Sequence, residues 1–92
     1  MTKRVQLKVK GKVQGVFYRA ETQSMAQSLG LRGYAQNNRD GSVTVVAVGE
    51  ESLLLELIEW CRKGPSRAHV DELEITFDDP PGDESLEGFS IY

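Results

Sequence analysis

Gly15 and Arg19 are the residues of this chain whose types and spacing first suggest chemistry. They lie in the run Gly-Lys-Val-Gln-Gly-Val-Phe-Tyr-Arg at residues 11–19, between an alternating apolar segment and a segment with helical spacing. Where a strand leads into a helix, unpaired backbone N–H groups and the helix dipole favour a bound anion. Gly15 permits a tight turn with inward-pointing amides, and the Arg19 guanidinium can bind two phosphate oxygens at once. Residues 14–19 are therefore a candidate phosphate-binding loop, with a purely structural turn as the alternative.

The glycines of this loop do not match a nucleotide-binding motif. The lysine and hydroxyl residue that follow the second glycine of a P-loop are missing, and the spacing is not that of a dinucleotide-binding fingerprint. The sequence therefore gives no support to a nucleotide ligand.

Asn37 is the second residue to which the sequence assigns a role. In a ferredoxin-like order of elements, the first two strands run in the same direction with the third between them. Their C-terminal ends therefore share one edge of the sheet. Two strand spacings, about 10 Å, then separate Asn37 from the loop, a gap that side chains can close. Its neutral amide would face the anion site. Asn38, in contrast, is interpreted as a turn residue ahead of Asp40 and Gly41.

The first half of the chain alternates between strand and helix patterns. Alternating apolar residues from Val5 predict a strand that continues toward Val13, and apolar or small residues at helical spacing predict a helix over residues 20–29. Residues 31–36 form a second predicted strand. A hairpin turn then leads to a third strand at residues 42–48, where valines occupy both faces, so we expect this strand inside the sheet.

The second half repeats the helix and strand patterns. After Gly49, an apolar stripe predicts a helix that ends at residues 64–65; the stripe consists of Leu54, Leu57, Ile58 and Cys61. A fourth strand is predicted from the alternation of Leu73, Ile75 and Phe77, with Val70 out of register as a sign of a bulge. Residues 78–84 form an acidic loop, and residues 89–91 are a possible last strand.

This order of elements is β-α-β-β-α-β, which predicts a ferredoxin-like α+β fold. We expect an α/β sandwich with an antiparallel sheet of four to five strands and both helices on one face. The fold alone specifies no function.

Composition narrows the classes of function. The chain has 92 residues, 39% of them hydrophobic and 27% charged, which predicts a single globular domain over residues 1–92. A net charge of −3 argues against a broad nucleic-acid surface, and no segment has the length or hydropathy of a membrane span or signal peptide. We expect a cytoplasmic monomer with no nucleic acid or membrane partner.

The remaining reactive side chains are predicted to have structural or surface roles. Cys61 lies on an apolar stripe and is expected to be buried, and His69 has no carboxylate or nucleophile pattern around it. The acidic residues at 78–84 lack the spacing of a calcium loop. We expect neither a metal ion nor a cofactor.

Two segments of the chain resemble the signatures of the acylphosphatase family. These signatures read G-x-V-Q-G-V-x-F/Y-R and G-W/Y-x-x-N-x-x-x-G-x-V, and they correspond here to residues 11–19 and 33–43. The resemblance implies hydrolysis of a small-molecule acyl phosphate to a carboxylate and inorganic phosphate. It implies that Asn37 positions the attacking water and that Arg19 binds the phosphate together with the backbone amides of the loop, which belong to Gly15, Val16, Phe17, Tyr18 and Arg19. Gln36 stands where a basic residue is common, which weakens the long-range attraction of an anion without touching the chemistry.

Two other functions remain as alternatives at this point. A ferredoxin-like module could bind a phosphate-containing ligand without hydrolysing it, although Asn37 argues for hydrolysis. RNA binding on the open sheet face is the other alternative, and the aromatic motif of that class is absent.

Overall fold

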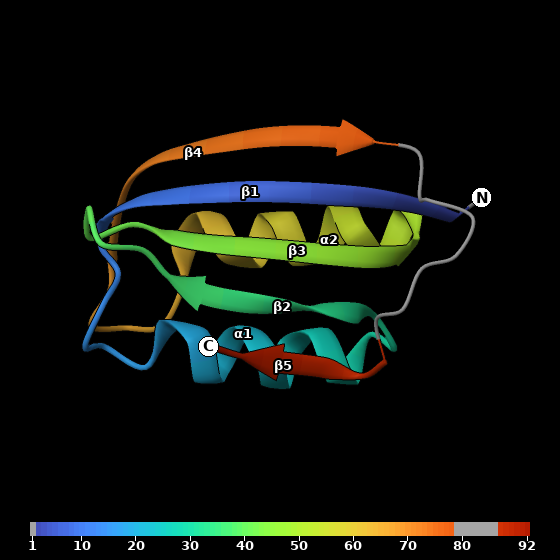
Figure 1. The fold of residues 1–92 in the computed structure, drawn as a ribbon, viewed down its shortest axis with the longest axis horizontal. Coiled ribbons are helices and arrows are strands. Elements are labelled where there is room, and N and C mark those ends of the chain that lie inside the picture. Colours follow the sequence, from blue (N-terminus) through green and yellow to red (C-terminus); the bar gives the residue numbers. More distant parts are fainter. Residues whose placement is uncertain (1, 79–86) are drawn as a thin grey trace.

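The computed structural model describes residues 2–78 and 87–92, which form two helices and a five-stranded sheet (Figure 1). In chain order the elements are β1 (Thr2–Lys12), α1 (Tyr18–Ser28), β2 (Arg32–Asn37), β3 (Val43–Glu50), α2 (Glu51–Lys63), β4 (His69–Asp78) and β5 (Phe89–Ile91). The predicted ferredoxin-like α+β fold is confirmed. Neither helix in the described ranges is long and apolar enough to cross a membrane.

The sheet has the strand order β4-β1-β3-β2-β5. As predicted, β1 and β2 both pair antiparallel with β3 and therefore run in the same direction. The expectation of an entirely antiparallel sheet was wrong for the last strand, because β5 pairs parallel with β2. The reason is geometric: β4 ends beside Arg4 and β5 starts beside Gly33, at the same end of the sheet, so β5 runs opposite to β4 and along β2.

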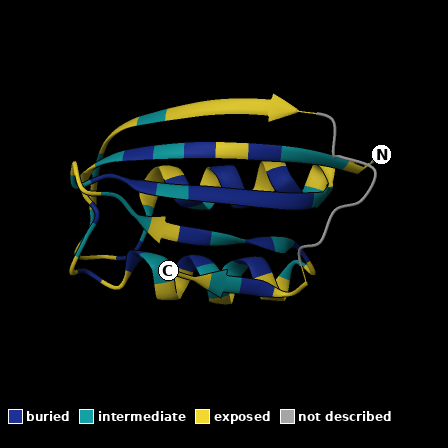
Figure 2. Ribbon diagram, in the orientation of Figure 1, coloured by how far each residue is buried: buried dark blue, intermediate teal, exposed yellow. Residues whose placement is uncertain are grey.

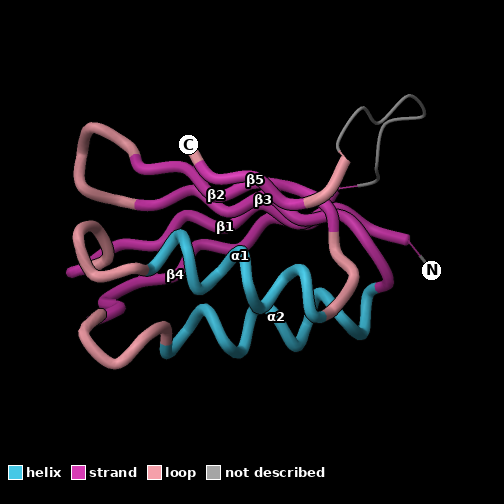
Figure 3. The backbone as a smooth tube through the Cα atoms, turned by 90° about the horizontal axis from the view of Figure 1, so that it is seen from below, coloured by secondary structure: helices cyan, strands magenta, loops and turns pink. Residues whose placement is uncertain are grey.

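Both helices cover the same face of the sheet, as expected (Figure 3). α1 packs against β2 and β5, and α2 packs against β3 and β1, so that one core lies between the helices and the sheet. Figure 2 shows the central strand β3 buried over most of its length. In α2 the predicted stripe of Leu54, Leu57, Ile58 and Cys61 is fully or almost fully buried. The central strand β3 is buried on both faces from Val45 to Val48, which confirms its predicted interior position.

The edge strand β4 differs from its sequence pattern in burial. The predicted irregularity is present, since Lys10 pairs with Glu72 whereas the next residue of β1, Gly11, pairs with Val70. Ile75 and Phe77, however, remain 36% and 41% exposed. They share a face with buried residues of β1, but β4 has a neighbouring strand on one side only, so alternation did not predict their burial correctly.

The remaining side chains named from the sequence have surface or core positions. His69 is exposed and its Nε2 lies 3.0 Å from a carboxylate oxygen of Asp71. Cys61 is a free, buried thiol, as predicted. Of the acidic segment at 78–84, Asp78 ends β4, and the other positions lie outside the described residues.

Candidate active site

The loop between β1 and α1 has two residues in the left-handed backbone region. Gly15 has φ +75°, and Phe17 has φ +65° immediately before the first helical residue, Tyr18. Within the described ranges, no backbone carbonyl accepts a hydrogen bond from the N–H groups of residues 15–19. Alternation of the backbone between left- and right-handed conformations points successive amides to one side, and such amides bind anions. The loop therefore has the donors that the sequence predicted.

Buried side chains fix this loop to the core. Val13, Val16 and Tyr18 are at most 5% exposed. The Tyr18 hydroxyl donates a hydrogen bond of 2.7 Å to the carbonyl oxygen of Cys61, and its ring packs against Trp60 at a centroid distance of 5.7 Å. Burial raises the pKa of the Tyr18 hydroxyl far above its ordinary value. Since this side chain points into the core, only the backbone of Tyr18 is available to a ligand.

Arg19 and Asn37 donate hydrogen bonds to the same main-chain oxygen. Arg19 Nη1 donates a hydrogen bond of 2.6 Å to the main-chain oxygen of Tyr92, and the backbone N–H of Asn37 donates to the same atom at 3.3 Å. The first turn of α1, the end of β2 and the residue after β5 therefore converge at this point. The sequence predicted that Arg19 and Asn37 share an edge of the sheet, but it did not predict that a main-chain atom of Tyr92 joins them.

The side chain of Asn37 has an unused acceptor. Asn37 is the last residue of β2, one position beyond the predicted strand end, and it is half-buried. Its Oδ1 is buried and accepts no hydrogen bond from any residue that the structure describes. A buried carbonyl oxygen without a partner is costly unless a ligand or water satisfies it. This atom is therefore suited to hold a polar ligand.

Gln14 ties the loop to the turn that follows Asn37. Its Nε2 donates hydrogen bonds to the carbonyl oxygens of Asn38 and Ser42, at 2.7 and 2.9 Å. Asn38 closes the same turn, because its Nδ2 donates to the side-chain oxygens of Ser42 and Thr44. Asn38 is thus a turn residue, as predicted. The role of Gln14 was missed, since its partners are main-chain oxygens distant in sequence.

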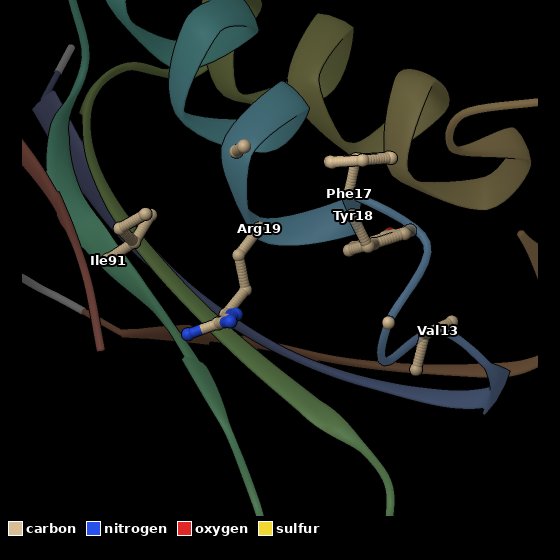
Figure 4. A pocket seen from close by; sticks show the side chains of 7 residues that line it. Val13, Phe17, Tyr18, Arg19 and Ile91 are labelled. Atoms are coloured by element: carbon tan, nitrogen blue, oxygen red, sulfur yellow. The ribbon is translucent and has the colours of Figure 1, made fainter.

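A cavity of about 260 Å³ opens at this loop (Figure 4). Its lining residues are Val13, Gly15, Phe17, Tyr18, Arg19, Ala20 and Ile91. In Figure 4, Arg19 extends from the start of α1 toward the sheet, with Ile91 on one side and Phe17 on the other. Val16 and Asn37 do not line this cavity, although Asn37 and the lining residue Arg19 both donate to the main-chain oxygen of Tyr92. Residues 2–78 and 87–92 contain no cluster of three or more potential metal ligands.

Comparison with known proteins finds acylphosphatases among the chains that are similar in sequence and in structure. A family model described as Acylphosphatase matches residues 5–91. The chain is 40% identical over 90 residues to an acylphosphatase of Rubrobacter xylanophilus, covering 98% of this chain and 80% of that protein. It is 55% identical over 67 residues to an acylphosphatase of Marinobacter nauticus, covering 73% of each chain. Its structure is similar to that of an acylphosphatase from Bacillus subtilis, with a TM-score of 0.92, 30% identity, and coverage of 100% of this chain and 99% of the other.

Proposed function

Because the chain belongs to the acylphosphatase family and hydrolyses acyl phosphates, we propose that Arg19 and the loop amides hold the phosphoryl group while Asn37 positions the attacking water. The observation that carries this proposal is the main-chain oxygen of Tyr92, to which both Arg19 and Asn37 donate.

The reaction itself requires little general acid or general base catalysis. An acyl phosphate is a mixed anhydride, so its leaving group is a carboxylate, whose conjugate acid has a pKa of about 4 to 5. Such a weak base departs without protonation by a general acid. Water forms a new bond to phosphorus while the bond between phosphorus and the acyl oxygen breaks, and the electron pair of that bond remains on the carboxylate. The proton lost by the water passes to a phosphate oxygen of the substrate.

Arg19 and the amides of residues 15–19 supply the charge stabilisation. Phosphoryl transfer is catalysed chiefly by positioned charge and hydrogen-bond donors on the equatorial oxygens. A guanidinium has five N–H donors, and the bond from Nη1 to Tyr92 uses one of them. No residue in the described ranges accepts from the remaining donors of Arg19, which can therefore bind phosphate oxygens, while the bond to Tyr92 restrains the side chain.

Asn37 orients the attacking water and does not act as a general base. An amide oxygen accepts a hydrogen bond from water but does not take a proton at neutral pH. The buried, unpartnered Oδ1 gives the water an acceptor in a fixed place, which aligns its lone pair with phosphorus.

The proposal also covers the domain organisation, oligomeric state, location and partners of the protein. The chain acts as a single domain over residues 1–92, as a monomer in the cytoplasm, on a small molecule and without nucleic acid. The described residues share one hydrophobic core, which supports a single domain, and the net charge of −3 argues against a nucleic-acid partner.

The test is hydrolysis of benzoyl phosphate by the wild type and by Arg19→Ala and Asn37→Ala, each without added metal and with a chelator. We expect each substitution to lower kcat/KM by about 10²- to 10³-fold, the cost of losing one pre-organised charge or donor. Arg67→Ala, which removes an exposed arginine after α2, is the matched control and keeps wild-type activity. Unfolding curves check that the variants fold. Full activity of Arg19→Ala or Asn37→Ala would overturn the assignment.

A further inference from the structure

Phe17 is a residue that the local backbone does not favour. It precedes α1 with φ +65° and ψ +18°, and it makes no side-chain capping bond. Glycine and asparagine adopt this left-handed conformation at lower cost than an aromatic residue, and asparagine can also cap a helix. The Phe17 side chain is 67% exposed and takes no part in the core. Neither backbone conformation nor core packing therefore explains a phenylalanine at this position.

The cavity provides a reason for it. The described residues include six large hydrophobic side chains that are exposed, and of these only Phe17 and Ile91 line the cavity. Ile91 ends β5 and is 41% exposed. Figure 4 shows the two side chains on opposite sides of Arg19, one on the loop and one on the sheet. Exposed apolar side chains that flank a polar site commonly contact the apolar part of a ligand.

We propose that Phe17 and Ile91 bind the acyl group of the substrate, so that the enzyme prefers acyl phosphates with an apolar, especially aromatic, acyl group. This inference rests on the proposed function, in which the loop amides and Arg19 hold the phosphoryl end. The acyl carbons then leave the loop between the two exposed side chains. Arg19 is the only charged residue in the lining, and the phosphoryl group occupies it, so a charged acyl group finds no partner there.

The experiment compares two substrates that share the phosphoryl end, benzoyl phosphate and acetyl phosphate. Phe17→Asn removes the ring and keeps a residue that tolerates positive φ. Because the backbone amide of Phe17 belongs to the phosphate-binding loop, the two substrates are compared within each variant. We expect the ratio of kcat/KM for benzoyl phosphate to kcat/KM for acetyl phosphate to fall about tenfold, as for loss of an aromatic contact. Ile91→Thr, which keeps a β-branched residue in the strand, lowers the benzoyl preference in the same direction.

The controls separate this inference from the proposed function. Phe77→Asn makes the same substitution at an exposed phenylalanine on β4, outside the cavity lining, and leaves the kcat/KM ratio of the two substrates unchanged. Competitive inhibition by inorganic phosphate keeps its wild-type constant in Ile91→Thr and Phe77→Asn, because neither residue belongs to the phosphate-binding loop. An equal loss with both substrates, or an unchanged ratio in both Phe17→Asn and Ile91→Thr, would overturn the acyl-binding role while leaving the catalytic assignment standing. A wild type that hydrolyses neither substrate would overturn the proposed function itself.

Discussion

At the scale of single residues, Arg19 combines two functions in one planar group. Nη1 bonds to the main-chain oxygen of Tyr92, so the guanidinium has a fixed direction before any substrate arrives. The other donors lie in the same plane and suit the spacing of phosphate oxygens. A side chain held in this way has lost part of its conformational freedom in advance, which favours binding of the transition state.

This geometry predicts that charge alone does not replace the arginine. In Arg19→Lys the positive charge remains, but all donors are on one nitrogen, which cannot hold Tyr92 and two phosphate oxygens in a single plane. We expect kcat/KM for benzoyl phosphate to fall by about 10²-fold, less than in Arg19→Ala. Steady-state kinetics of both variants measure the difference. Wild-type activity in Arg19→Lys would show that only the charge matters.

At the scale of elements, the site depends on how two loops at the same edge of the sheet are held together. The loop before α1 carries the amides, and the turn after β2 follows Asn37. The side-chain amide of Gln14 bridges them through two hydrogen bonds. Asp40 stabilises the turn from its other side, because it accepts hydrogen bonds from the backbone N–H and the hydroxyl of Ser42 and lies 3.2 Å from Lys8. These partners hold the pKa of the Asp40 carboxyl well below its usual range.

Removing the bridge is expected to impair catalysis more than binding. Gln14→Leu removes two hydrogen bonds, although the carbonyl oxygens of Asn38 and Ser42 each keep a backbone N–H donor. At a net of about 0.5 to 1.5 kcal/mol for each bond, the loss lowers the free energy of unfolding by about 1 to 3 kcal/mol. Because Asn37 then moves relative to the loop, we expect kcat to fall about tenfold with little change in the inhibition constant of phosphate. Gln27→Leu, at an exposed position of α1, is the matched control and keeps wild-type kinetics. An unchanged kcat in Gln14→Leu would show that the bridge has only a structural role.

The elements also show which features sequence patterns can predict. Period and turn signals depend on neighbouring residues, so they predicted every helix and strand, and the valines of β3 predicted its central place. The direction of β5 and the exposure of Phe77 depend on which strand lies beside which, and no local pattern contains that information. Gly33 is a similar case: with φ +150°, an added Cβ would lie 1.8 Å from the carbonyl oxygen of Val46, a contact across the sheet that the sequence does not reveal.

In the candidate site too, local features were predicted from the sequence and contacts between distant residues were not. Arg19, Gly15 and Asn37 were predicted from residue type and topology, because their side chains or conformations suit the chemistry, and their roles stay a prediction. The hydrogen bonds to the main-chain oxygen of Tyr92 were not predicted, because they depend on how β5 pairs with β2. Gln14 was included in the loop without a role, because its hydrogen-bond partners lie 24 and 28 residues away.

At the scale of the whole molecule, the core beneath the site contains two ionisable groups that must stay neutral. Cys61 is fully buried on α2, where burial raises the pKa of its thiol to about 12. The neighbouring Tyr18 hydroxyl, also buried, has its pKa raised as well. The loop is therefore anchored by a pair of groups that titrate only at high pH.

Alkaline pH should consequently destabilise the fold. Both pKa values are raised by folding, so below about pH 9 folded and unfolded chains hold the same protons, and above it the unfolded chain releases protons that the folded chain retains. Stability is thus complete below the unfolded pKa and is lost as pH rises toward the folded one, by about 1.4 kcal/mol per pH unit for each group. Urea unfolding at several values from pH 7 to 10.5 measures this slope.

In Cys61→Ala we expect stability at pH 7 to fall by about 1 kcal/mol and the alkaline slope to become shallower, because only Tyr18 still contributes. Ile58→Val, at a core position on the same helix, costs about 1 kcal/mol at every pH and keeps the wild-type slope, so an identical slope in Cys61→Ala would show that the thiol does not contribute.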